Sequence, residues 1–158
     1  MRTRGVLHVE TEVLVPFFDI DSMDVVWHGH YVKYLEIARC ALLDRLGHNY
    51  AQMKTAGYVW PVIDLQLRYV RAARFGQRLR VRADLAEWKN RLKIHYLLSD
   101  AESGERLTRA STVQVAVNIA DGAMQLPTGL RRCRGAPSAM NVGSLIPSPR
   151  HIHLTGIA

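Results

Sequence analysis

The first part of the chain alternates apolar and polar positions. In residues 6–18, alternate positions from Val9 to Val15 are apolar or threonine, with Glu10 and Glu12 between them. This period of two is typical of a strand with one buried face. We expect that strand to end within residues 16–19.

The pattern then changes to the period of a helix. Over residues 29–46, apolar side chains recur at steps of three and four, from Tyr31 to Leu46. Gly47 follows, where glycine commonly ends a helix. The other side of this helix is not cleanly polar, because Tyr34 and further apolar residues lie on it. We therefore predict one long helix that is largely enclosed, most simply by a curved sheet.

The next pattern is extended, after a short helical or turn segment at residues 49–57. Turn signals at residues 75–76, 89–90 and 102–104 divide the extended part into segments. Connections this short join antiparallel neighbours, so we expect consecutive strands to pair. The strand candidates are residues 59–71, 77–88, 91–100 and 105–119.

This order of elements predicts an α+β fold, in which a curved antiparallel sheet of about five strands wraps one long central helix. A single sheet of this kind leaves its edges uncovered, so we expect a homodimer or homotetramer. Residues 1–133 are predicted to form the single domain. Residues 134–158 are rich in Pro, Gly and Ser without a clear period, and we expect a loosely ordered C-terminal extension.

Composition narrows the class of protein. The chain has 158 residues, of which 48% are hydrophobic, enough for one domain with a sizeable core. No stretch approaches the roughly 20 apolar residues of a membrane span, and the N-terminus lacks the apolar core of a signal peptide. We expect a cytoplasmic protein that does not bind membranes. Its net charge of +7 favours an anionic partner: nucleic acid, coenzyme A or an acidic acyl carrier protein.

Ionisable side chains are densest in residues 19–31, DIDSMDVVWHGHY, between the first strand and the helix. No Ser, Thr, Asp or Asn stands directly before Tyr31 to cap the helix, and Gly29 lets a ligand approach the backbone closely. Unpaired N–H groups at such a helix start suit an oxyanion site. A nearby acid would attack a carbonyl bound there, or activate water to attack it.

A thioester is the carbonyl compound that one carboxylate and an oxyanion site could suffice to cleave. Its leaving thiol has a pKa of about 8.5 and departs without much help from a general acid, whereas an amine needs one. The chain has no G-x-S-x-G motif and no legible Ser-His-Asp order. Both absences agree with hydrolysis driven by a carboxylate.

The run PFFDIDSMDVVWHGHYVKYLEIARCALLDRLG, residues 16–47, resembles the signature of the hotdog-fold acyl-CoA thioesterases of the 4-hydroxybenzoyl-CoA thioesterase-like family. The matching features are an aromatic residue before D-x-D, the V-V-W run with its histidine, and E-x-A-R. The resemblance implies a hotdog fold and thioester hydrolysis without a cofactor.

The resemblance also implies roles for residues. The second acid of D-x-D, Asp21, would be the nucleophile or general base. The backbone N–H groups of His28 and Gly29 would polarise the thioester carbonyl at the start of the central helix. The sequence departs from the family where a glycine usually follows the acid by two or three residues, because Met23 and Asp24 stand there.

Substrate-binding residues are predicted on two elements. Tyr31 and Tyr34, together with residues 59–71, are expected to line the acyl tunnel. Related enzymes hold the phosphates of coenzyme A with basic residues at a dimer interface, which implies this role for Arg68 and Arg71. The alternative for these arginines is a solvated sheet edge that discourages aggregation.

Simpler interpretations stand beside these roles. Asp21 would serve equally as a turn residue after a strand. His28, His30 and Asp21 lack a further ligand at recognisable spacing, so we predict no metal site. Glu36 is expected to pair with Arg39 or Lys33 within the helix.

The sequence therefore predicts a thioesterase that acts on an acyl or aroyl thioester of coenzyme A or of an acyl carrier protein. One alternative is a hotdog dehydratase that pairs His28 with Glu36. Another is a non-catalytic protein that binds acyl groups or nucleic acid. We expect no nucleic-acid partner, because no helix-turn-helix, zinc-finger or RNP-like pattern is present.

Overall fold

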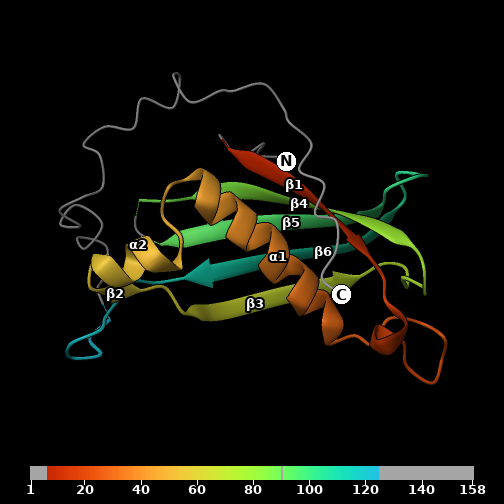
Figure 1. Cartoon of the computed structure of the whole chain (residues 1–158), viewed down its shortest axis with the longest axis horizontal. Helices are drawn as coiled ribbons and strands as arrows, with labels where there is room; N and C mark the ends of the chain where they lie inside the picture. Colours follow the sequence, from red (N-terminus) through yellow and green to blue (C-terminus); the bar gives the residue numbers. More distant parts are fainter. Residues whose placement is uncertain (1–6, 90, 125–158) are drawn as a thin grey trace.

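A five-stranded antiparallel sheet crossed by one long helix forms the centre of the molecule (Figure 1). The structure, a computed structural model, describes residues 7–89 and 91–124. The helix α1 spans His30–Arg45 and lies against one face of the sheet. The sheet has the order β1-β4-β5-β6-β3. Its strands are β1 (His8–Leu14), β3 (Val62–Tyr69), β4 (Arg78–Glu87), β5 (Leu92–Asp100) and β6 (Arg106–Gln114).

Smaller elements lie at the two ends of α1. The 3-10 turn η1 (Phe17–Asp19) precedes it, and the short helix α2 (Tyr50–Thr55) follows it. Two short strands, β2 (Tyr58–Val59) and β7 (Val117–Asn118), pair antiparallel beside α2. The predicted arrangement of about five antiparallel strands and one long helix is confirmed.

The core lies between α1 and the inner face of the sheet. Tyr34, Ala38 and Leu42 of α1 are at most 1% exposed, as are Val81 of β4 and Ile94 of β5. Full burial of one large apolar side chain stabilises a fold by about 1.5–3 kcal/mol. The helix is therefore held mainly by this packing, as its largely apolar sequence predicted.

The predicted pairing of consecutive strands is correct for β4, β5 and β6 but wrong for β3. This strand pairs with β6, and β4 pairs with β1 and β5. Residues 70–77 carry the chain across the end of the sheet, and Ala73 in this connection is fully buried. Its carbonyl accepts a hydrogen bond from Val26 N–H at 2.9 Å. Contacts with a distant loop, rather than a local turn, thus direct the crossover.

Strand boundaries also differ from the prediction. The first strand ends at Leu14 because η1 follows it. The candidate at residues 59–71 is split around Pro61, which cannot donate a ladder hydrogen bond. The candidate at residues 105–119 is split as well, because its last part turns away to pair with β2.

The predictions for the C-terminal part of the chain fall on residues that the structure does not describe. The domain boundary at 133/134 and the C-terminal extension at 134–158 lie outside the described residues. Within residues 7–89 and 91–124, none of the helices has the length and apolar character needed to cross a membrane.

Candidate active site

The loop between η1 and α1 is a compact turn that presents Asp21. Ile20 and Val26 form an isolated antiparallel bridge, and Asp21 N–H donates to the carbonyl of Val25 at 2.9 Å. The Asp21 carboxylate accepts a hydrogen bond from Met23 N–H at 2.8 Å. Asp21 is therefore a turn residue, as the simpler interpretation predicted, and its side chain remains partly exposed.

Asp24 stands at a position where the family resemblance led us to expect glycine, and its backbone geometry shows why glycine would suit it. Its φ of 59° lies in the left-handed region that favours glycine. Aspartate tolerates this region better than most residues, because its short polar side chain bonds locally. The turn geometry is thus retained although the glycine is absent.

A pocket of about 220 Å³ lies beside this loop. Four of the predicted site residues line it: Asp21, His28, Tyr31 and Arg71. The other lining residues are mostly apolar and come from the same loop and from the end of β3; they are Met23, Val25, Val26, Tyr69, Val70 and Ala72. Segments far apart in sequence therefore form one wall around Asp21.

The start of α1 offers free backbone donors next to this pocket. Gly29 is the N-cap residue and provides no side-chain cap, while His30 N–H donates to the carbonyl of Trp27 at 2.9 Å. Among the described residues, the N–H groups of His28 and Gly29 donate to no acceptor. Such groups at a helix N-terminus favour negative charge.

The Trp27 ring packs directly over Gly29. A β-carbon at position 29 would lie 2.1 Å from the nearest atom of this ring, far inside van der Waals contact. Any larger residue at position 29 would therefore require the Trp27 indole, which is 47% exposed, to move.

Tyr31 closes the floor of the pocket. It is 2% exposed, and its hydroxyl accepts a hydrogen bond from Ala73 N–H at 2.9 Å. Burial raises the pKa of Tyr31 above its usual value, and the nearby charge of Asp21 acts in the same direction. The phenol therefore keeps its proton at neutral pH, close to the candidate catalytic carboxylate.

Tyr34, predicted to bind substrate, does not line the pocket. Its hydroxyl donates to the carboxylate of Asp19 at 2.5 Å. Asp19 is 1% exposed and also accepts hydrogen bonds from Lys33 Nζ at 2.6 and 2.7 Å. Burial alone would raise the pKa of Asp19, but the bonds from Lys33 and Tyr34 outweigh it and lower that pKa. The first acid of D-x-D thus anchors α1 to η1.

The two predicted arginines lie in different places. Arg71 lines the pocket and forms an ion pair with Glu105, Nε to Oε1, at 2.9 Å. Arg68 lies outside the pocket lining, on the exposed strand β3, where it faces Arg109 of β6. Only Arg71 is placed where it would touch a ligand in this pocket.

Tyr69 lies within residues 59–71, the segment predicted to line the acyl tunnel, and it does line the pocket, but its contact with the loop before α1 was not predicted. Its hydroxyl donates to the carbonyl oxygen of His28 at 2.8 Å, across 41 positions of the chain. Its ring meets Tyr31 edge to face, with centroids 5.1 Å apart. No local pattern marks this contact, because His28 lies on another segment of the chain.

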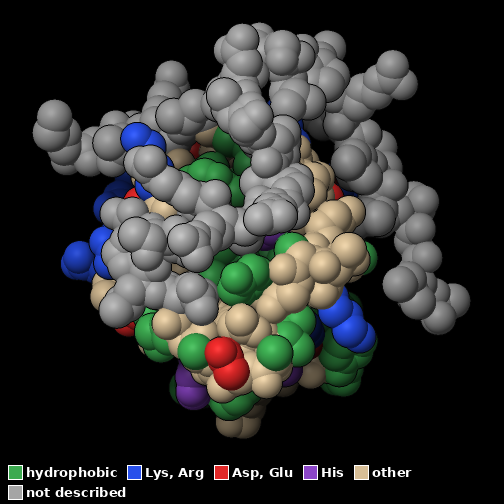
Figure 2. Space-filling model, turned by 90° about the vertical axis from the view of Figure 1, so that its left-hand side faces the viewer, with side chains coloured by type: hydrophobic (Ala, Val, Ile, Leu, Met, Phe, Trp, Pro, Cys, Tyr) green, Lys and Arg blue, Asp and Glu red, His purple; other side chains and the backbone are tan. Residues whose placement is uncertain are grey.

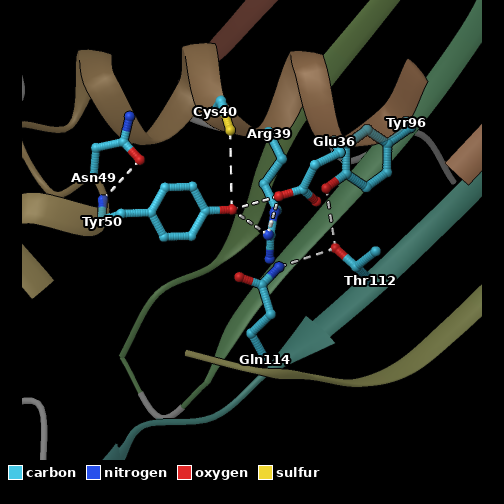
Figure 3. A network of polar contacts seen from close by, with 8 residues as sticks. All are labelled: Glu36, Arg39, Cys40, Asn49, Tyr50, Tyr96, Thr112 and Gln114. Atoms are coloured by element: carbon cyan, nitrogen blue, oxygen red, sulfur yellow. Dashed lines mark hydrogen bonds and ion pairs between the residues drawn. The ribbon is translucent and has the colours of Figure 1, made fainter. Parts of the chain in front are cut away.

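Glu36 belongs to a separate polar network between α1, α2 and the sheet (Figure 3). It forms an ion pair with Arg39 and accepts a hydrogen bond from the hydroxyl of Tyr50, which confirms the predicted pairing with Arg39. Glu36 does not line the pocket that contains His28. The pairing needed by the dehydratase alternative is therefore not formed.

A second groove, of about 550 Å³, lies at the far end of α1. Figure 2 shows hydrophobic side chains on this end of the molecule. Among the described residues, its lining includes no carboxylate and, of the predicted substrate-binding positions, only Val59; it is lined by Tyr50, Lys54, Val59, Val117, Asn118, Ile119 and Gly122. Over the part of the chain that the structure describes, no three His, Cys, Asp or Glu side chains gather as metal ligands.

Comparison with known sequences gives a consistent result. The family described as the thioesterase-like superfamily matches residues 15–136. "Putative esterase sll0410" of Synechocystis sp. is 36% identical over 103 residues, 65% of this chain and 62% of that protein. The match thus spans less than two thirds of that relative. "Putative acyl-CoA thioesterase YneP" of Bacillus subtilis is 25% identical over 113 residues, 71% of this chain and 82% of that protein.

Solved structures show the same likeness. A DHNA-CoA thioesterase from Staphylococcus aureus superposes with a TM-score of 0.70 and 26% identity, covering 75% of this chain and 80% of that one. A hypothetical protein from Thermus thermophilus has a TM-score of 0.67 and 31% identity, covering 77% of this chain and 94% of that one.

Proposed function

Since this chain belongs to the thioesterase-like superfamily, we propose that it hydrolyses acyl or aroyl thioesters of coenzyme A in the pocket beside Asp21. The family resemblance and the hotdog fold predicted from the sequence are both confirmed. The proposal adds the reaction, its site and its substrate class.

One observation carries the proposal. The carboxylate of Asp21 lies on the same short loop as the N–H groups of His28 and Gly29, which donate to no acceptor among the described residues, and both Asp21 and His28 line one pocket. A carboxylate supplies the attacking group, and free amides at a helix N-terminus stabilise the oxyanion that forms. Thioester hydrolysis needs little more, because a thiolate leaves readily.

The proposed reaction begins with the thioester carbonyl oxygen at the His28 and Gly29 amides. Asp21 then either attacks the carbonyl carbon, forming an acyl anhydride, or removes a proton from a water molecule that attacks it. In both routes the C–S bond breaks and the thiolate departs. In the first route water then hydrolyses the anhydride, which releases the acid and restores the Asp21 carboxylate. Oxygen from isotope-labelled water found in the Asp21 side chain after turnover would identify the first route.

The substrate class follows from the relatives and the rim of the pocket. Proteins similar to this chain are named for coenzyme A thioesters, and Arg71 supplies a positive charge at the pocket. The apolar part of the wall, including Val26 and Val70, suits the acyl or aroyl group. We propose coenzyme A as the donor, with an acyl carrier protein as the alternative.

We also propose that the protein acts as a homodimer or homotetramer. Strand β3 is at the edge of the sheet and is paired only with β6 among the described residues. Its apolar side chains are exposed, with Ile63 at 52% and Tyr69 at 46%. An exposed apolar edge strand is unstable against pairing, and a second copy would cover it.

The test compares thiol release from a panel of acyl- and aroyl-CoA esters by wild type, Asp21→Asn and Asp24→Asn. Asp24 lies on the same turn but outside the pocket lining, and asparagine also tolerates a positive φ. We expect Asp21→Asn to lower kcat by at least about a hundredfold, while Asp24→Asn keeps wild-type activity.

Other outcomes would change the conclusion. Equal loss in both variants would indicate damage to the turn and not to a catalytic group. Undiminished activity in Asp21→Asn would remove Asp21 from its role. If wild type cleaves only carrier-protein thioesters, the donor is corrected; if it cleaves neither, the proposed function is wrong.

A further inference from the structure

We infer that Tyr69 is a positioning residue for the oxyanion amides, acting through the carbonyl of His28. This inference rests on the proposed function, because it assigns a part in thioester hydrolysis to a residue that does not supply the attacking group. It concerns the last residue of the edge strand β3.

Tyr69 donates its hydrogen bond to the peptide group that joins His28 to Gly29, the two residues whose N–H groups form the proposed oxyanion site. Its hydroxyl donates to His28 O at 2.8 Å, and the nitrogen of the same peptide unit belongs to Gly29. A peptide unit is planar, so fixing its oxygen also fixes the plane and direction of its N–H. Tyr69 therefore controls the orientation of the Gly29 donor without touching it.

This restraint matters because the N–H side of that peptide has no hydrogen bond of its own among the described residues. The His28 and Gly29 N–H groups have no acceptor among the described residues, and Gly29 lacks a side chain that would restrict its backbone. A hydrogen bond to the carbonyl also polarises the peptide and strengthens the N–H as a donor. Preorganised donors contribute to catalysis because they need no rearrangement as charge develops.

The Tyr69 ring is itself held in place. Tyr31 packs against it edge to face, and the Tyr31 hydroxyl accepts the N–H of Ala73 in the segment that follows β3. The carbonyl of Ala73 in turn accepts Val26 N–H at 2.9 Å. The end of β3 and the segment that follows it are thus joined to the loop before α1 and to the first turn of α1 at three points: Tyr69 to His28, Ala73 to Tyr31, and Val26 to Ala73.

A purely structural role for Tyr69 would have a different signature. Loss of a structural bond lowers stability and leaves turnover of the folded enzyme intact. Loss of a positioning bond lowers kcat, since a misdirected donor stabilises the transition state less, and leaves KM nearly unchanged. Measuring kcat and KM separately therefore distinguishes the positioning role from the structural one.

The experiment compares wild type, Tyr69→Phe and Tyr58→Phe on the best coenzyme A ester from the panel above. Phenylalanine keeps the ring that packs on Tyr31 and removes only the hydroxyl. Tyr58 is a matched control, because it is half-buried on β2 and its hydroxyl makes no hydrogen bond among the described residues. Thermal unfolding is measured for all three proteins.

We expect Tyr69→Phe to lower kcat about tenfold, with KM within about twofold of wild type and the pH profile unshifted. Tyr58→Phe should match wild type. If Tyr69→Phe keeps wild-type kcat while wild type hydrolyses thioesters, this inference is overturned and the proposed function stands. A rise in KM alone would also overturn it, by making Tyr69 a binding residue. If no protein hydrolyses any thioester, both fall together.

Discussion

Asp19 carries a charge in a place where an isolated charge would be unstable. Its side chain is inaccessible to solvent, and its carboxylate receives hydrogen bonds from Lys33 and Tyr34 of α1 and lies 3.7 Å from His30 Nε2. Breaking a buried charged pair by removing one partner is costly, because the other partner is left without its bonds. The two acids of D-x-D therefore have different parts: Asp19 holds the helix, and Asp21 faces the pocket.

Replacing Asp19 tests this division. We expect Asp19→Asn to lower the free energy of unfolding by about 2 kcal/mol, because bonds to a charged group are each worth about 1.5–3 kcal/mol. Urea denaturation measures the change. Asp21→Asn is the control and should stay within about 0.5 kcal/mol of wild type. Equal stability of the two variants would contradict the anchoring role of Asp19.

The lowered pKa of Asp19 also predicts how its contribution to the stability of the fold changes with pH. A carboxyl with a lower pKa in the folded state stabilises the fold above its unfolded pKa, and that stability is lost as pH falls through the folded pKa. As pH falls, the free energy of unfolding of Asp19→Asn should therefore decrease less than that of wild type. Urea denaturation at neutral and at acidic pH measures this difference.

At the scale of elements, the connection from α1 to α2 contains a histidine, His48, that packs beside two tryptophans. The rings of Trp60 and Trp88 are stacked with an interplanar angle of 6°, and His48 meets both edge to face. Burial lowers the pKa of His48 from its ordinary value of 6.5. The folded protein therefore favours the neutral imidazole of His48 over the protonated one.

This burial predicts a pH dependence of stability. Below about pH 6.5 the unfolded chain binds a proton at His48 that the folded chain does not bind, so the free energy of unfolding decreases as pH falls. Near pH 7.5 His48 is neutral in both states and has no such effect. The decrease should level off below the folded pKa.

Urea denaturation of wild type and His48→Phe at pH 7.5 and 5.5 measures this effect. Phenylalanine keeps an aromatic ring beside the tryptophans but cannot bind a proton, so the variant should lose less stability on acidification than wild type. His95, whose pKa burial also lowers, is present in both proteins and cancels in the difference. Identical losses would show that His48 does not contribute.

At the scale of the whole molecule, the proposed association of copies involves the exposed edge strand β3. Leu65, Leu67 and Tyr69 share the face of the sheet that carries α1, because they pair with Thr112, Ala110 and Thr108. Leu65 is 38% exposed. A second copy at this edge would bury these side chains next to the pocket, since Tyr69 belongs to both.

Charge on the inner face of β3 should therefore separate the copies. We expect Leu65→Asp to be monomeric by size-exclusion chromatography with light scattering, and to lose activity with the interface. Gln66→Asp, on the opposite face of the same strand, is the control and should keep the wild-type mass. A monomeric wild type, or an unchanged mass for Leu65→Asp, would contradict assembly through β3.

Much of the fold follows from local patterns. Alternation predicted most of β1, and the helical period predicted α1 to within one residue at each end. Asp21, His28 and Gly29 could be proposed as site residues because they lie within nine consecutive positions of one loop. Periodicity, turn residues and contiguous motifs act over a few residues, and these are the features that a sequence displays directly.

Contacts between distant segments were decided only by the tertiary structure. Nothing near Tyr69 indicates that it reaches His28, and short turns alone favoured β4 as the neighbour of β3 in place of β6. The crossover depends on the burial of Ala73 beneath the loop before α1. The sequence by itself thus determined most of the elements, the family and the loop proposed for catalysis, because each depends on neighbouring residues. The strand order and the contact of Tyr69 with His28 depend on which surfaces pack together, so only the folded chain could decide them.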